Sequence, residues 1–248
     1  MHLSIIIPVF NEVKLLPKIL FRIFKETKKI NKEIIIIDDN SNDGTKEWLS
    51  GLKNRFNLID IKNNKLIFSK RKKGNLQIFL KEKNEGKGSA VKIGLKQSSK
   101  EIIVIQDADM EYMPKDLNKM IKIIHNEKSD IVFGNRFSSK QNKYHYFLYG
   151  VGNFFLSYFT SFVFCKKISD VAVCYKMFRR DVINNIEIES NDFMFDFEFT
   201  SKVLKKKKWA FSEVDIFYKG RTFEEGKKIS WVDGFKALLV ILKIRIFS

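Results

Sequence analysis

Three short, mainly apolar runs constrain the fold of this chain more than any other feature. They occupy residues 3–7, 33–37 and 102–105. Runs of this length, rich in β-branched side chains, are typical of strands that are buried on both faces. A segment with helical periodicity follows each strand, as in residues 15–24. Because strands and helices alternate, we expect an α/β fold with a Rossmann-like, mainly parallel sheet and helices on both faces.

The residues that follow these strands are expected to meet at one edge of the sheet, which we call the rim. Asp107, Asp109 and Glu111 follow the third run, and Asp38 and Asp39 follow the second. Ligands of parallel α/β sheets bind outside the carboxyl ends of the strands. Carboxylates gathered there repel one another unless a hard cation such as Mg²⁺ or Mn²⁺ joins them. The rim therefore predicts a metal site for a phosphorylated substrate, although strand ending and helix capping also explain such acids.

The charge balance favours an anionic partner. The chain has 46 Lys and Arg against 29 Asp and Glu, which gives a net charge of +17. Such an excess suits nucleic acid, an anionic membrane or phosphorylated ligands, and a well-solvated lysine-rich surface is the alternative. The two cysteines lack CxxC spacing and the three histidines are scattered. We therefore expect a reducing compartment and no structural metal site.

Two apolar segments raise the question of a membrane. Residues 146–165 approach the ~20 residues that span a bilayer, but small and polar side chains recur on one helical face. Residues 231–247 mix apolar side chains with lysine and arginine. We expect amphipathic interfacial helices at about 144–165 and at 231–248, with core packing as the alternative for the first. Because no spanning segment follows, we expect a peripheral protein on the cytoplasmic face of the membrane.

Four motifs, in this order and spacing, resemble the inverting glycosyltransferases of family 2, which have the GT-A fold. They are S-I-I-I-P-V-F-N-E at 4–12, I-D-D-N-S-N-D-G-T at 37–45, N-E-G-K-G at 84–88 and D-A-D at 107–109. The second half resembles the branch that loads sugar onto a polyprenyl phosphate, as dolichol-phosphate mannosyltransferase does. The motifs there are G-N-R at 134–136, D-V-A-V-C-Y-K at 170–176, F-D-F-E at 195–198, and Arg221 with Lys227. The resemblance implies a GT-A domain over residues 1–230, followed by the basic helix over 231–248.

The resemblance also implies roles for individual residues. Contacts to the nucleotide sugar are expected from Pro8, Phe10, Glu12, Ile37, Asp39, Lys87, Asp107, Ala108 and Asp109. The residues expected to hold Mg²⁺ or Mn²⁺, which would stabilise the leaving nucleoside diphosphate, are Asp109, Asp107 and Glu111. The catalytic candidates are Asp109, Arg136, Arg221 and Lys227. Arginine can bind phosphate through two parallel hydrogen bonds, whereas lysine acts as a point charge.

The acceptor decides whether a catalytic base is needed. A sugar hydroxyl must lose a proton to a positioned carboxylate, for which Asp196 and Glu198 are the candidates. A polyprenyl phosphate, with a second pKa of about 6 as in other phosphate monoesters, arrives already ionised. With that acceptor, Asp196 and Glu198 would instead bind sugar hydroxyls or pack a helix end.

We therefore expect an enzyme that moves a hexose, with inversion, from a nucleotide-diphosphate sugar to a polyprenyl phosphate at a membrane surface. GDP-mannose and UDP-glucose both suit the scaffold as donors. The alternative is a transferase that acts on a sugar hydroxyl of a lipid-linked glycan or cell-surface polysaccharide. A basic nucleic-acid-binding protein is a remote alternative, because the acidic rim would repel nucleic acid and no such binding motif is present.

One irregular stretch, residues 62–75, is strongly basic. We expect a hairpin that pairs residues 66–70 with residues 76–80 across a basic turn. The turn is basic enough to contact phosphate or membrane, with a solvated loop as the alternative.

Overall fold

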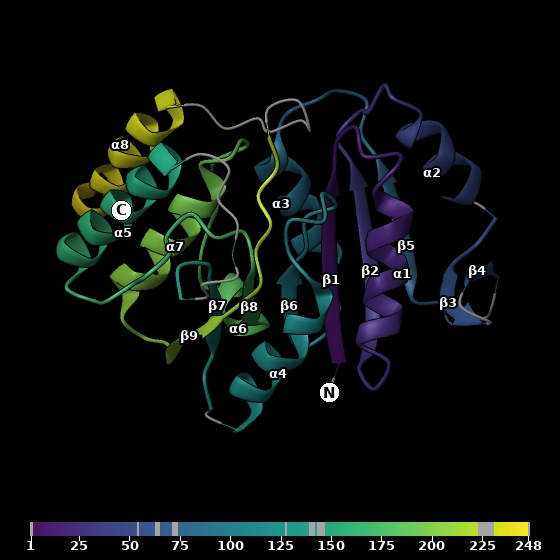
Figure 1. Ribbon diagram of the computed structural model, residues 1–248, viewed down its shortest axis with the longest axis horizontal. Helices are drawn as coiled ribbons and strands as arrows, with labels where there is room; N and C mark the ends of the chain where they lie inside the picture. The colour runs from purple at the N-terminus through teal and green to yellow at the C-terminus, as the bar shows by residue number, and fades with distance from the viewer. Residues whose placement is uncertain are drawn as a thin grey trace.

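A seven-stranded, mainly parallel sheet forms the centre of the molecule (Figure 1). The computed structural model describes residues 2–53, 55–62, 65–70, 74–126, 128–138, 142, 147–222 and 231–247. The strands of this sheet are β1 (His2–Val9), β2 (Asn31–Asp38), β5 (Leu76–Leu80), β6 (Ile102–Ile105), β7 (Ile131–Asn135), β8 (Lys176–Arg179) and β9 (Phe211–Asp215). Their order is β5-β2-β1-β6-β8-β7-β9, and β8 runs antiparallel to both of its neighbours. The α/β fold predicted from the sequence is confirmed.

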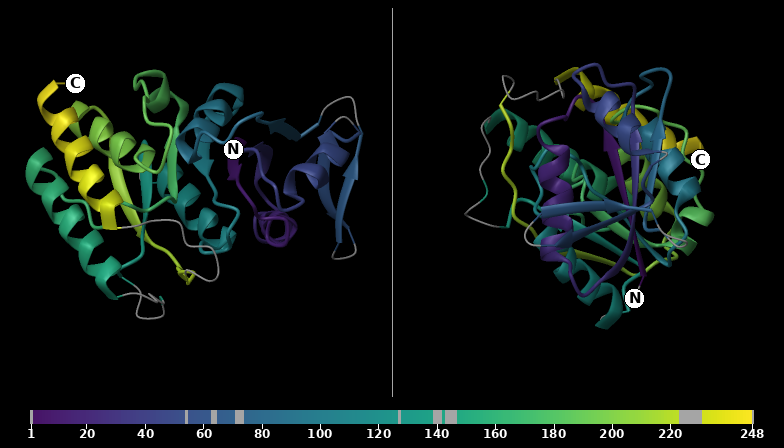
Figure 2. Two further views of the ribbon diagram at one scale, coloured as in Figure 1. Left: turned by 90° about the horizontal axis from the view of Figure 1, so that it is seen from above. Right: turned by 90° about the vertical axis from the view of Figure 1, so that its right-hand side faces the viewer.

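Helices cover both faces of the sheet (Figure 2). They are α1 (Leu16–Glu26), α2 (Thr45–Lys53), α3 (Lys87–Gln97), α4 (Leu117–Asn126) after the 3₁₀ turn η1 (Pro114–Asp116), α5 (Phe147–Phe164), α6 (Arg180–Asn184), α7 (Phe195–Lys206) and α8 (Trp231–Phe247). On one face, α1 packs beside η1 and α4, while α3 and α7 lie on the other. Because both faces are covered, the isoleucines of β1, β2 and β6 are almost completely buried.

The residues after β3 (Leu58–Lys62) fold differently from the expected hairpin. Strand β4 (Lys65–Ser69) pairs antiparallel with β3, and β5 pairs in parallel with β2. The predicted pairing of residues 66–70 with 76–80 is therefore wrong. Leu76 and Ile78 are buried, so joining the central sheet keeps apolar area from water that an isolated hairpin would expose. The Asn75 side chain, bonded to both backbone groups of Ile59, directs the chain into β5.

Helices α5 and α8 lie side by side at one end of the molecule and expose many apolar side chains (Figures 1 and 2). Among the described residues, every exposed large apolar side chain except Ile67 belongs to these two helices. They are Val151, Phe154, Phe155, Tyr158 and Phe162 on α5, and Val232, Phe235, Leu239, Leu242, Ile246 and Phe247 on α8. We call this surface the α5–α8 face.

The polar side of α5 points into the protein. Ser157 and Thr160 are buried, whereas Phe154 and Phe162 are 64% and 76% exposed. The two-sided pattern predicted for this segment is present, with its polar side packed on the core. No helix within the described ranges is both long and apolar enough to cross a membrane.

Two helical glycines test how tightly the sheet is covered. A methyl group added at Gly94 of α3 would overlap the Ile6 side chain of β1, whereas one added at Gly51 of α2 would meet nothing within 4 Å. Gly51→Ala should therefore stabilise the protein by up to about 1 kcal/mol through helix propensity. Gly94→Ala should destabilise it by about 1–3 kcal/mol because of overpacking. Urea unfolding of both variants checks the opposite signs, and equal effects would contradict this packing.

Candidate active site

Arg221 joins the acidic residues that follow two different strands. Its Nη1 lies 2.8 Å from Glu12 Oε1, beyond β1, and its Nη2 lies 3.3 Å from Asp109 Oδ2, beyond β6. Its backbone N–H donates to Glu111 Oε1 at 2.7 Å. The structure thus brings together four residues that the sequence analysis had assigned to the site from motifs far apart in the chain. Lys227, the remaining cationic candidate, lies outside the described residues.

The charge around Asp109 is only partly balanced. Burial and the nearby charges of Asp107 and Glu111 raise the pKa of Asp109 to about 8, although Arg221 acts in the opposite direction. Among the described residues, these acids do not converge as a ready set of three metal ligands. A divalent cation, which prefers carboxylate oxygens, would nevertheless fit here, because it would favour the ionised form of Asp109 and offset the repulsion from its acidic neighbours. Asp109 and Glu111 are the residues that would hold it.

Asp107 and Asp196 share one lysine. Lys87, the first residue of α3, lies 3.0 Å from Asp107 Oδ1 and 3.3 Å from Asp196 Oδ2. Burial alone would lower the pKa of Lys87, but these two carboxylates raise it well above its usual value. Lys87 therefore stays protonated at the rim, where the sequence analysis expected it to contact a nucleotide sugar.

The loop before α3 depends on Asp39. The Asp39 carboxylate accepts hydrogen bonds from the backbone N–H groups of Glu85 and Gly86 and from the ammonium group of Lys81. Gly86 has φ of +98°, and a Cβ there would lie 2.7 Å from the Asn191 carbonyl oxygen, so this position favours glycine. Asp39 thus shapes the loop that carries Lys87. Its predicted contact with the nucleotide stays a prediction.

The other predicted nucleotide contacts differ in exposure. Pro8, Ile37 and Ala108 are buried in the structure, so they would reach a ligand chiefly through backbone atoms. Phe10 is partly exposed beyond the end of β1. Asp38 is buried and accepts a hydrogen bond from Ser41 N, which agrees with a local role in the turn after β2.

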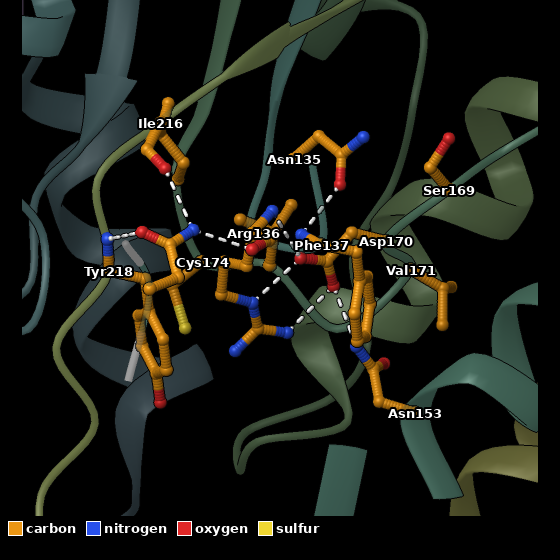
Figure 3. Close-up of polar contacts among 12 residues, drawn as sticks. Asn135, Arg136, Phe137, Asn153, Ser169, Asp170, Val171, Cys174, Ile216 and Tyr218 are labelled. Atoms are coloured by element: carbon orange, nitrogen blue, oxygen red, sulfur yellow. Dashed lines mark hydrogen bonds and ion pairs between the residues drawn. The ribbon is translucent and has the colours of Figure 1, made fainter. Parts of the chain in front are cut away.

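The guanidinium group of Arg136 makes a bidentate contact with the carboxylate of Asp170 (Figure 3). The Nε and Nη2 atoms donate to the two carboxylate oxygens of Asp170, each at 2.7 Å, and Asp170 is completely buried. The guanidinium carbon lies 5.1 Å from the centroid of the Tyr218 ring. These contacts hold the guanidinium in one plane. Nη1 has no partner among the described residues and is the group that Arg136 can offer to an anion.

Tyr218 contacts both Arg136 and Glu111, a role that was not predicted from the sequence. Its phenol is hydrogen-bonded to Glu111, and burial, the largest influence, raises the pKa of Tyr218. Its ring lies 5.5 Å from that of Tyr112, and the two residues form an isolated β-bridge. The position of Tyr218, three residues before Arg221, was the only available signal.

Neither candidate base is an unpaired carboxylate. Asp196 lies 2.7 Å from the Lys176 ammonium group as well as close to Lys87. Burial would raise the pKa of Asp196, but the two lysines lower it. Glu198 accepts hydrogen bonds from the backbone of residues 189 and 190 and pairs with Lys202 at 2.7 Å. Burial opposes the resulting shift, yet the pKa of Glu198 is also lowered.

Comparison with known proteins identifies the family. The sequence matches the family described as "Glycosyl transferase family 2" over residues 4–187. The chain belongs to glycosyl transferase family 2. The predicted resemblance is thus confirmed, and the protein is a glycosyltransferase.

Named relatives include enzymes of dolichol phosphate. A dolichol-phosphate mannosyltransferase of Pyrococcus furiosus is 31% identical over 137 residues, which cover 55% of this chain and 34% of the relative. A dolichyl-phosphate beta-glucosyltransferase of Dictyostelium discoideum is 29% identical over 230 residues, which cover 88% of this chain and 61% of the relative. The chain therefore spans between a third and two thirds of the length of these two relatives.

The fold is also that of solved glycosyltransferases. Glucosyl-3-phosphoglycerate synthase from Mycobacterium tuberculosis, solved with Mn²⁺, UDP and phosphoglyceric acid, superposes with a TM-score of 0.69 at 13% identity. The match covers 100% of this chain and 79% of that protein. At this identity the likeness concerns the fold alone, and it confirms the predicted GT-A architecture.

Asp109→Asn tests the acidic side of the site. Loss of this charge should lower the rate of glycosyl transfer roughly 10²-fold or more, as expected for one key electrostatic contact. The unfolding temperature should not fall, because a neutral amide relieves the repulsion that raises the pKa of Asp109. Initial rates and thermal melts check both points, with the exposed Asp181→Asn on α6 as control. Full activity with unchanged metal dependence would remove Asp109 from this role.

Proposed function

We propose that this protein transfers a hexose from a nucleotide-diphosphate sugar to a polyprenyl phosphate at a membrane surface, with inversion and with Mg²⁺ or Mn²⁺. The observation that carries this proposal is the pairing of both candidate bases with lysines. Asp196 and Glu198 have lowered pKa values and occupied oxygens. Such carboxylates are poor proton acceptors. A phosphate nucleophile, which is already ionised, needs none.

The cationic side chains suit two phosphate groups. Arg221 and Lys87 lie among the acidic residues, where a donor diphosphate would be held, and the predicted Lys227 would add to them. Arg136 lies over the ring of Tyr218 and presents Nη1, which suits the acceptor phosphate. Catalysis would then consist of orienting two anions and stabilising the charge that develops on the leaving group.

A divalent metal at Asp109 and Glu111 would supply Lewis-acid stabilisation of the leaving nucleoside diphosphate. Two observations support metal use by this chain. The first is the raised pKa of Asp109, which reflects burial and incompletely balanced negative charge. The second is that glucosyl-3-phosphoglycerate synthase, a protein of the same fold, was solved with UDP and either Mn²⁺ or Mg²⁺.

The lipid acceptor and the membrane location are supported by the relatives' names and by the α5–α8 face. Large exposed apolar patches mark binding surfaces. Lys236, Lys243 and Arg245 are exposed on α8 among its apolar side chains, and this combination suits an anionic leaflet. We therefore propose a location at the cytoplasmic face of the membrane, with α5 and α8 lying in the interface.

The chemistry of the product tests the acceptor. With membranes, Mg²⁺ or Mn²⁺ and a panel of radiolabelled nucleotide sugars, one donor should yield labelled lipid in the organic phase. Mild acid should release free sugar from it, because a glycosyl phosphate is more labile than an ordinary glycoside. A glycolipid with an ordinary glycosidic bond is the control. An acid-stable product would favour a hydroxyl acceptor and would return Asp196 and Glu198 to the role of base.

Liposome flotation tests the α5–α8 face. Phe162 and Leu239 are 76% and 54% exposed there, whereas Ile67, 38% exposed, lies on β4. Replacing Phe162 and Leu239 together by serine should weaken binding to anionic liposomes at least tenfold, because each side chain contributes about 1.5–3 kcal/mol when fully buried. Ile67→Ser should bind normally, and high salt should partly release the wild type. Wild-type protein that ignores anionic liposomes would contradict the membrane proposal.

A further inference from the structure

One stripe of side chains on the polar side of α5 is hydrogen-bonded to residues 168–171. Asn153, Ser157 and Ser161 are four residues apart and therefore lie along one face of the helix. Four hydrogen bonds join the stripe to that segment: Asn153 Nδ2 to Asp170 Oδ1 (2.8 Å), Val171 N to Ser157 Oγ (3.0 Å), Ile168 N to Ser161 Oγ (3.0 Å) and Ser161 Oγ to the Ile168 carbonyl oxygen (3.1 Å). The first of these reaches the carboxylate that holds Arg136.

Asp170 is shared between Arg136 and Asn153 (Figure 3). Its Oδ1 accepts hydrogen bonds from Arg136 Nη2 and Asn153 Nδ2, and its Oδ2 accepts from Arg136 Nε and from the Arg136 backbone. A buried carboxylate needs such donors to satisfy its oxygens. Asn153 therefore fixes the orientation of the carboxylate, and the carboxylate fixes the orientation of the guanidinium.

As a result, Nη1, the remaining donor of Arg136, points in a fixed direction. In-plane contacts with Asp170 and the Tyr218 ring above it leave little freedom to the Arg136 side chain, which is only 11% exposed. Nη1 is directed away from Asp170 (Figure 3). A donor held in this way loses less entropy when it binds an anion than one on a mobile chain.

We propose that Asn153 and Asp170 are positioning residues that orient Arg136 toward the phosphate of the acceptor. This inference rests on the proposed function. It gives α5 two roles, because its outer side belongs to the α5–α8 face and its inner side orients the arginine that binds the acceptor. One helix would thereby set the height of the phosphate-binding group above the membrane, so that a lipid phosphate at the interface meets Nη1.

Asn153→Asp is the most direct test, because it keeps the size of the side chain and replaces a donor to Asp170 with a second carboxylate. The kcat/KM for polyprenyl phosphate should fall tenfold or more, through a higher KM for that acceptor. The dissociation constant for the nucleotide sugar and the binding to anionic liposomes should change less than twofold. Ser161→Ala, which removes two hydrogen bonds to Ile168 of the same segment but none to Asp170, should leave all of these values unchanged.

A double-mutant cycle separates positioning from a general structural role. Arg136→Lys removes the two-pronged contact, so adding Asn153→Asp to it should cause no further loss in kcat/KM for the acceptor. Additive losses, or an Asn153→Asp variant with normal acceptor kinetics, would overturn the inference. A parallel loss of nucleotide-sugar affinity and thermal stability would also overturn it. Wild-type enzyme that is inactive with every polyprenyl phosphate would instead overturn the proposed function, and this inference with it.

Discussion

The ion pairs of Arg221 with Glu12 and Asp109 partly offset the negative charge of these acidic side chains, and the rest of the site depends on this balance. These residues follow β9, β1 and β6, so one guanidinium links the segment after the edge strand β9 to those after the neighbouring central strands β1 and β6. Carboxylates at the rim repel one another in a buried setting. Because burial and the charges of Asp107 and Glu111 outweigh the effect of Arg221, the pKa of Asp109 remains raised. A divalent cation bound there would favour the ionised form of Asp109 and offset the repulsion among these carboxylates.

The cationic side chains of the site lie in two kinds of surroundings. On one side, Lys87 and Arg221 lie among the acidic residues. On the other, Arg136 is held by Asp170 and by the ring of Tyr218. Both candidate bases, Asp196 and Glu198, are paired with lysines, and this pairing is the basis for proposing a nucleophile that is already ionised. The α5–α8 face would add the apolar surface that the proposed lipid-borne phosphate requires.

The fold was largely predictable from the sequence because buried strands and their helices leave periodic patterns. The acidic rim was predictable for the same reason, since parallel strands place their carboxyl ends at one edge. The pairing of β4 was mispredicted because strand partners depend on which edge of the sheet is open, and local spacing does not reveal that. The roles of Asp170 and Tyr218 were not found, because each depends on a side-chain contact with Arg136 across a long stretch of chain.

The central claim is that a phosphate oxygen, and not a hydroxyl, attacks the sugar. Phosphorus NMR of the purified lipid product tests this directly. A phosphate monoester titrates with a pKa of about 6, so its resonance moves between pH 5 and pH 7, whereas a glycosyl phosphate diester has no such proton. We predict a product resonance that does not shift over this range and that appears in proportion to the sugar transferred. A labelled product whose phosphorus resonance still titrates like the free polyprenyl phosphate would contradict the account.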